Sequence, residues 1–174
     1  MKKSPRRLTK KPAKSINRIY IDQSGKVEYT PTHTVIAFAN GKKSAITIKA
    51  KDKRIIQSIF RNMGKGQIYV LWLFSFLIYL LIKDTDFKEI TIDTEYPGKS
   101  DLIKNYLLGH FRKHGKKISP STIHFHEIGR NEAHWHAYYV FTGKRKSEKI
   151  ASIKEIRREV TKWLQKKTEC FVAI

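Results

Sequence analysis

The sequence is poor in cysteine and in acidic residues. Its 174 residues include one cysteine, Cys170, so an intrachain disulfide framework and a cysteine-based zinc cluster are both excluded. Only 15 Asp and Glu residues accompany 36 Lys and Arg residues, which gives a net charge of +21. An excess of this size favours a polyanionic partner, nucleic acid first and an anionic membrane surface second.

The N-terminal 18 residues lack the pattern of a signal peptide. They contain eight basic residues and two prolines, but no acidic residue and no apolar central stretch. Such a segment is typical of a disordered basic arm. Together with the single thiol, which suits a reducing compartment, this favours a cytoplasmic protein.

The sequence has one long hydrophobic run, at residues 68–82, which is apolar apart from Ser75. About 20 residues are needed to cross a bilayer, so the run is short for a membrane span, although Lys65 and Lys83 flank it as they would a span. A helix packed on a sheet and covered by other helices is apolar all round for the same reason. We therefore favour a buried helix, with a membrane-attached protein as the less favoured alternative. The sequence leaves open a contribution of this run to a subunit interface.

Hydrophobic periodicity predicts an alternation of strands and helices. The first fifty residues predict three antiparallel strands, with Asn40 and Gly41 forming a hairpin turn. Strands that are joined through helices run parallel, with right-handed crossovers. The predicted strands cover residues 19–22, 34–39, 44–50, 89–93 and 121–128, and the predicted helices cover residues 51–62, 68–82 and 100–113, a segment from Glu132, and residues 152–166.

These elements define an α/β fold with a mixed five-stranded sheet, three antiparallel strands followed by parallel strands, flanked by helices. The core is expected to cover residues 19–146. Residues 147–174 are expected to form a C-terminal helix and tail that pack on this core. No internal repeat is visible.

Acidic residues end two of the predicted strands, Asp22 after the first and Asp93 after the fourth. Functional sites in open α/β sheets form at the carboxyl ends of strands, so these carboxylates should converge if the two strands are neighbours. Glu132 begins the helix after the fifth predicted strand, and His136 lies one turn later on the same face. These four residues are the predicted catalytic and metal-binding residues. Glu95, two positions beyond Asp93, is predicted to be an auxiliary ligand.

An oxygen-rich ligand set of this kind suits Mg²⁺ or Mn²⁺ better than zinc. Two such ions, about 4 Å apart, can activate water and stabilise the leaving oxygen in phosphodiester hydrolysis. Each residue also has a structural interpretation: Asp22 and Asp93 as turn or cap residues, Glu132 as a charge that complements the helix dipole, and His136 as a packed side chain. The spacing of the nearby histidines, at positions 124, 126, 134 and 136, fits no usual zinc site.

The order of elements, with IYID at the first strand, ITIDTE at the fourth and GRNEAHWHA at the last core helix, resembles the ribonuclease H-like superfamily. That superfamily includes ribonuclease H and the RuvC-type Holliday junction resolvases, and the resemblance covers about residues 19–146. It implies two-metal nuclease chemistry, with Asp22, Asp93, Glu132 and His136 as the ligands. Ribonuclease H has an acid on its first helix, where this chain offers only Asp52 at the start, so the chain is closer to the resolvases.

Basic residues near these elements are predicted to follow a phosphate backbone without reading its sequence. Tyr138 and Tyr139 are predicted to be core or shelf residues rather than platforms for stacked bases. The predicted nucleic-acid-binding residues are Lys99, Arg130, Lys144, Arg145 and Lys146.

The sequence thus predicts an endonuclease that uses two Mg²⁺ or Mn²⁺ ions and acts on structured nucleic acid, either branched DNA such as a Holliday junction or an RNA–DNA hybrid. The alternative is a non-catalytic nucleic-acid-binding protein on the same fold. A branched substrate favours a homodimer, because two symmetric cuts need two sites.

Overall fold

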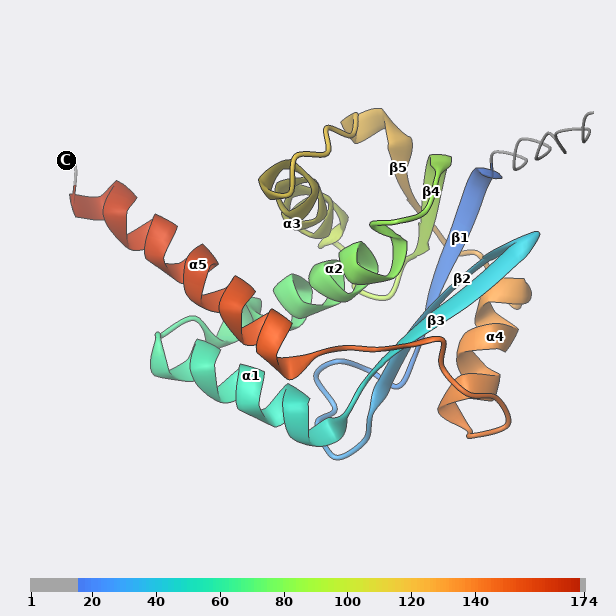
Figure 1. Ribbon diagram of the computed structural model, residues 1–174, viewed down its shortest axis with the longest axis horizontal. Helices are drawn as coiled ribbons and strands as arrows, with labels where there is room; N and C mark the ends of the chain where they lie inside the picture. The colour runs from blue at the N-terminus through green and yellow to red at the C-terminus, as the bar shows by residue number, and fades with distance from the viewer. Residues whose placement is uncertain (1–15, 173–174) are drawn as a thin grey trace, which may run out of the picture.

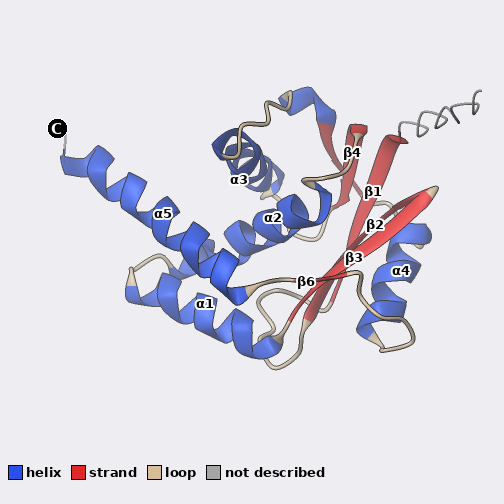
Figure 2. Cartoon of the chain, in the orientation of Figure 1, coloured by secondary structure: helices blue, strands red, loops and turns tan. Residues whose placement is uncertain are grey.

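The computed structural model describes the backbone of residues 16–172 and the side chains of residues 18–163. Six strands form one mixed sheet, in the order β5-β4-β1-β2-β3-β6 (Figures 1 and 2). The strands are β1 (Ile16–Ser24), β2 (Thr34–Asn40), β3 (Lys42–Ile48), β4 (Phe87–Asp93), β5 (Ile123–His126) and β6 (Lys149–Ile150). The helices are α1 (Ala50–Asn62), α2 (Tyr69–Ile82), α3 (Ser100–Lys113), α4 (Glu132–Phe141) and α5 (Ile153–Val172), with short 3-10 turns η1 (Gly66–Ile68) and η2 (Pro120–Thr122).

The α/β class and the mixed sheet, antiparallel first and then parallel, are confirmed. β1, β2 and β3 pair antiparallel, whereas β4 pairs parallel with both β1 and β5. The predicted number of five strands was wrong, because β6 pairs parallel with β3 at the outer edge of the sheet. A two-residue strand is too short to leave a periodic pattern in the sequence. β1 also begins earlier than predicted, at Ile16, and residues 1–15 of the predicted arm lie outside the described residues.

Alternation along the strands gives the sheet two different faces. Ile19 and Ile21 of β1 lie in the main hydrophobic core, on the side of α1, α2, α3 and α5 (Figure 1). The opposite face carries a smaller apolar cluster beneath α4, to which α4 contributes Ala137 and Val140. Helix α4 packs over β1, β2 and β3. Asp22 therefore faces α4, because it alternates with Ile21 along the strand.

The long hydrophobic run forms α2, which lies in the middle of the main core (Figure 2). Tyr69 and all residues from Leu71 to Ile82 are buried, since the helix contacts the sheet on one side and α1 and α3 on others. Ser75 donates its hydroxyl hydrogen to the carbonyl oxygen of Leu71, at 2.6 Å, which satisfies the polar group inside the core. The run is thus core and not a subunit interface. No helix among the described residues combines the length and apolar character of a membrane span.

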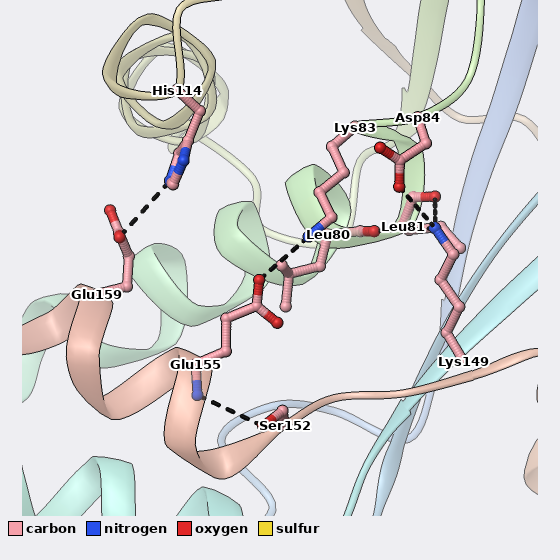
Figure 3. Close-up of polar contacts among 9 residues, drawn as sticks. All are labelled: Leu80, Leu81, Lys83, Asp84, His114, Lys149, Ser152, Glu155 and Glu159. Carbon is pink, nitrogen blue, oxygen red and sulfur yellow. Dashed lines mark hydrogen bonds and ion pairs between the residues drawn. The ribbon is translucent and has the colours of Figure 1, made fainter.

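The segment after α4 is attached to the core by charged side chains (Figure 3). Lys149 of β6 donates to the carbonyl oxygens of Leu80 and Leu81, at 3.2 and 3.0 Å, near the C-terminus of α2, where carbonyls lack helical partners. In α5, Glu155 pairs with Lys83 at 3.1 Å, and the buried Glu159 pairs with Lys113 at 2.7 Å. These contacts place α5 against α2 and α3.

The loop between β1 and β2 is held by a fully buried lysine of α1. Lys53 donates from Nζ to the carbonyl oxygens of Lys26 and Tyr29, at 3.0 and 2.8 Å, and to Thr34 Oγ1 at 2.8 Å. Burial lowers the pKa of Lys53 to about 8. The loop starts at Gly25, whose φ of 72° favours glycine, and a Cβ there would collide with the Phe141 ring. The chain just after Asp22 is thereby fixed against the C-terminal end of α4.

Candidate metal centre

Three carboxylates meet where β1 and β4 end. The parallel pairing of Ile21 with Ile92 places the next residues, Asp22 and Asp93, side by side. Oxygens of Asp22, Asp93 and Glu95 all lie within 4.8 Å of one another. Strand pairing thus brings together two acids that are far apart in the sequence, as expected at the carboxyl edge of neighbouring parallel strands.

The three carboxylates repel one another in a partly buried setting. Burial raises the pKa of Asp22, and the charge of Asp93 raises it further, while the backbone N–H of Gln23, which donates to Asp22 Oδ1 at 2.6 Å, lowers it. Burial, followed by the charges of Asp22 and Asp93, raises the pKa of Glu95 to about 7. Asp93 accepts a hydrogen bond from the backbone N–H of Ile128, at 2.9 Å. Such a cluster fits a hard divalent cation, because oxygen ligands suit Mg²⁺ and Mn²⁺ and the cation would offset the repulsion.

A histidine that the sequence analysis did not select completes the cluster. Nδ1 of His134 lies 2.9 Å from Oδ2 of Asp22. Helix α4 starts where it does because Asn131 caps it, its Oδ1 accepting hydrogen bonds from the N–H groups of Ala133 and His134. This cap places His134 in the first turn, beside β1, where it orients the Asp22 carboxylate.

Glu132 and His136, both predicted to be ligands, lie elsewhere. The Glu132 side chain is 63% exposed and pairs with Lys43 of β3 at 3.6 Å. His136 is buried, and its Nε2 lies 3.2 Å from an oxygen of Glu148, on the β3 side of α4. Nδ1 of His136 has no hydrogen-bond partner among the described residues. One helical turn separates the two residues as predicted, but that face of the helix points away from the carboxylate cluster.

The small residues of α4 show which face of the helix lies on the sheet, and His134 could have been considered from that pattern. Ala133 and Ala137 are fully buried and mark the stripe of the helix that lies on the sheet. Positions 134 and 136 fall on opposite flanks of this stripe. Which flank faces β1 depends on the direction in which α4 crosses the sheet, and that direction is not encoded in the helix itself.

A groove opens beside the cluster, on the same face of the sheet. It has a volume of about 380 Å³, and it is lined by residues of β1, β4, β5 and the segment before α4. Ile128, which donates to Asp93, is one of these lining residues. The groove therefore lies beside the Asp93 side of the cluster. The lining residues are Arg18, Tyr20, Thr91, His126, Glu127, Ile128 and Asn131.

The structure places the five predicted nucleic-acid-binding residues on the surface. None of them forms an ion pair with an acidic side chain in the described part of the chain. Arg130 immediately precedes the cap of α4, and Lys144 and Arg145 follow its C-terminal end. Their charges are therefore not neutralised by an acidic side chain of the described residues. The exposed residues are Lys99, Arg130, Lys144, Arg145 and Lys146.

No protein-family model matches the chain, and no curated protein matches its sequence at a significant level.

Proposed function

We propose that the chain is a divalent-metal-dependent nuclease with a ribonuclease H-like fold. The observation that carries this proposal is the meeting of Asp22, Asp93 and Glu95 within 4.8 Å at the ends of adjacent parallel strands. The net charge of +21 supports a polyanionic substrate, since the carboxylates lie in an otherwise basic chain. β1 and β4 are neighbours in the sheet, which fits the resemblance of the sequence to the ribonuclease H-like superfamily.

In the proposed phosphodiester hydrolysis, the carboxylates and His134 have different roles. Asp22, Asp93 and Glu95 would hold Mg²⁺ or Mn²⁺, and the bound cation would supply activation of water and stabilisation of charge on the phosphate. His134 keeps the Asp22 carboxylate in its orientation through the 2.9 Å contact. Burial and then the charges of Asp22 and Asp93 raise the pKa of Glu95, and a bound cation should lower it again by offsetting those charges.

The substrate class is structured nucleic acid, either branched DNA or an RNA–DNA hybrid. The test is a cleavage assay on labelled hybrid, duplex and four-way junction, with Mg²⁺, with Mn²⁺ and with a chelator. We expect cleavage of at least one substrate with either metal and none with the chelator. Binding without cleavage under every metal condition would contradict the proposal.

That second result would support the alternative function, a nucleic-acid-binding protein without catalysis. One observation favours this alternative: Glu132 and His136 lie outside the cluster, which leaves three carboxylates where four or five ligands were predicted.

Replacing His134 with Ala is expected to lower the cleavage rate about 10- to 100-fold, because a partner that orients a metal ligand contributes by about this factor. The carboxylates remain, so raising the Mg²⁺ concentration should restore part of the rate. The measurement is the initial cleavage rate across a Mg²⁺ titration. His136→Ala is the matched control, since this histidine lies on the same helix but contacts Glu148, and its rate per folded molecule should stay within about threefold of the wild type. Equal losses in both variants would remove His134 from the site.

A further inference from the structure

Helix α4 carries large aromatic side chains on the face opposite the sheet. Its inner stripe consists of Ala133, Ala137 and Val140, all buried. On the outer side, Trp135 is 40% exposed and Tyr138 is 39% exposed, with Tyr139 half-buried beside them. Of the two alternatives predicted for these tyrosines, core or shelf, the exposure of Tyr138 excludes the core. These rings add little to the core, and large exposed rings gathered on one surface indicate an interaction site.

The three rings form one continuous surface, here called the α4 platform (Trp135, Tyr138 and Tyr139). The centroids of Trp135 and Tyr139 lie 5.9 Å apart with an interplanar angle of 27°, and Tyr138 meets Trp135 at 6.0 Å in an edge-to-face arrangement. Trp135 also contacts the ring of His134, at 5.3 Å, and His134 contacts Asp22. The platform is therefore continuous with the candidate metal centre.

Two cations lie over the tyrosine rings of the platform. Nζ of Lys144 lies 5.9 and 5.7 Å from the ring centroids of Tyr138 and Tyr139, and Cζ of Arg145 lies 5.7 Å from that of Tyr139. Neither cation forms an ion pair with an acidic side chain of the described residues. The one acid of α4, Glu132, pairs with Lys43. Aromatic rings beside cations that no carboxylate neutralises complement a ligand that carries both flat rings and negative charge.

We propose that the α4 platform binds unpaired bases of single-stranded nucleic acid by stacking, with Lys144 and Arg145 on the adjoining phosphates. The inference rests on the proposed function only in taking nucleic acid as the ligand. Bases inside a duplex are stacked on one another and offer no free face, so the platform selects strands with unpaired bases. Junctions, bulges and strand ends provide such bases, whereas a continuous duplex does not.

The test is binding of a labelled oligothymidylate and of a continuous duplex, both measured by fluorescence anisotropy in the presence of a chelator, so that cleavage plays no part. For the double variant Trp135→Ala/Tyr138→Ala, we expect at least about 10-fold weaker binding of the single strand, given the usual contribution of one stacked base. Duplex binding should change less than about threefold. Tyr29→Ala is the matched control, because Tyr29 is an exposed ring at 57% that lies outside the platform.

A second variant, Trp135→Phe, keeps a stacking ring and should retain binding within about threefold, which separates stacking from a loss of folding. Equal weakening of single strand and duplex, or no weakening, overturns the proposal. A shift of tryptophan fluorescence with anionic phospholipid vesicles that is absent in Trp135→Phe, with no shift on the oligonucleotide, overturns it in favour of a membrane surface. Selective loss of single-strand binding by a protein that never cleaves supports the platform and contradicts only the nuclease proposal. Cleavage with unchanged single-strand binding in the variants contradicts only the platform.

Discussion

Replacing Asp93 with Asn is expected to lower metal-dependent cleavage about 1,000-fold while leaving nucleic-acid binding within about threefold of the wild type. A metal ligand supplies several kcal/mol of transition-state stabilisation, and each 1.4 kcal/mol corresponds to about a factor of 10 in rate. Asn keeps an oxygen that can accept the hydrogen bond from the N–H of Ile128, so the local backbone should be retained. The measurements are single-turnover cleavage rates and binding in a chelator.

Asp86→Asn is the matched control for this variant. Asp86 is exposed and precedes β4, at the opposite end of the strand from Asp93. The substitution therefore removes the same charge without changing the cluster. Its cleavage rate should equal that of the wild type. An Asp93→Asn protein that cleaves at a rate close to the wild type would show that the three carboxylates do not serve the reaction.

Acidification is expected to destabilise the fold through His110 of α3. This histidine is 3% exposed and packs against the rings of Trp72 and Phe76, at 5.2 and 4.9 Å. Nε2 of His110 has no hydrogen-bond partner among the described residues. Burial, with smaller contributions from the charges of Lys113 and His114, lowers the pKa of His110 to about 3. The folded protein therefore keeps His110 neutral at pH values where the unfolded chain binds a proton.

The direction of the effect follows from proton linkage. Between pH 6.5 and pH 3 the unfolded state binds more protons at this residue, so the free energy of unfolding falls as the pH is lowered through this window. At pH 4.5 the loss from His110 amounts to roughly 3 kcal/mol. Urea unfolding of the wild type and of His110→Phe at pH 7.5 and pH 4.5 measures it. The variant should lose roughly 3 kcal/mol less than the wild type between the two pH values. Equal losses would mean that His110 takes up its proton in the folded state.

Much of the architecture follows from local patterns in the sequence. Residues 100–113 were predicted as a helix and form α3, and residues 34–39 lie within β2. The pair Asp22 and Asp93 could be identified because each acid ends an apolar strand, and the parallel pairing of β1 with β4 depends on crossover rules that apply to most α/β proteins. The apolar composition of α2 did not by itself separate a core helix from a membrane helix. α2 is apolar on all sides because α1 and α3 cover the faces that the sheet does not.

The rest depends on contacts that no local pattern contains. β6 has two residues, and it is a strand only because β3 offers a free edge for Lys149 and Ile150. The choice between His134 and His136 depends on how α4 crosses the sheet. Glu132 has the right type and spacing for a ligand, but the first position of the helix leaves its side chain largely in solvent, beside Lys43.

The central claim, that distant acids form a metal centre, is tested most directly by isothermal titration of the wild type and of Asp22→Asn with Mn²⁺, without nucleic acid. We expect saturable binding to the wild type and at least about 10-fold weaker binding to the variant. Asp22 has an oxygen within 4.8 Å of oxygens of both Asp93 and Glu95, and its carboxylate is oriented by His134. Indistinguishable titrations of the two proteins, or no heat of binding in the wild type, would contradict the account.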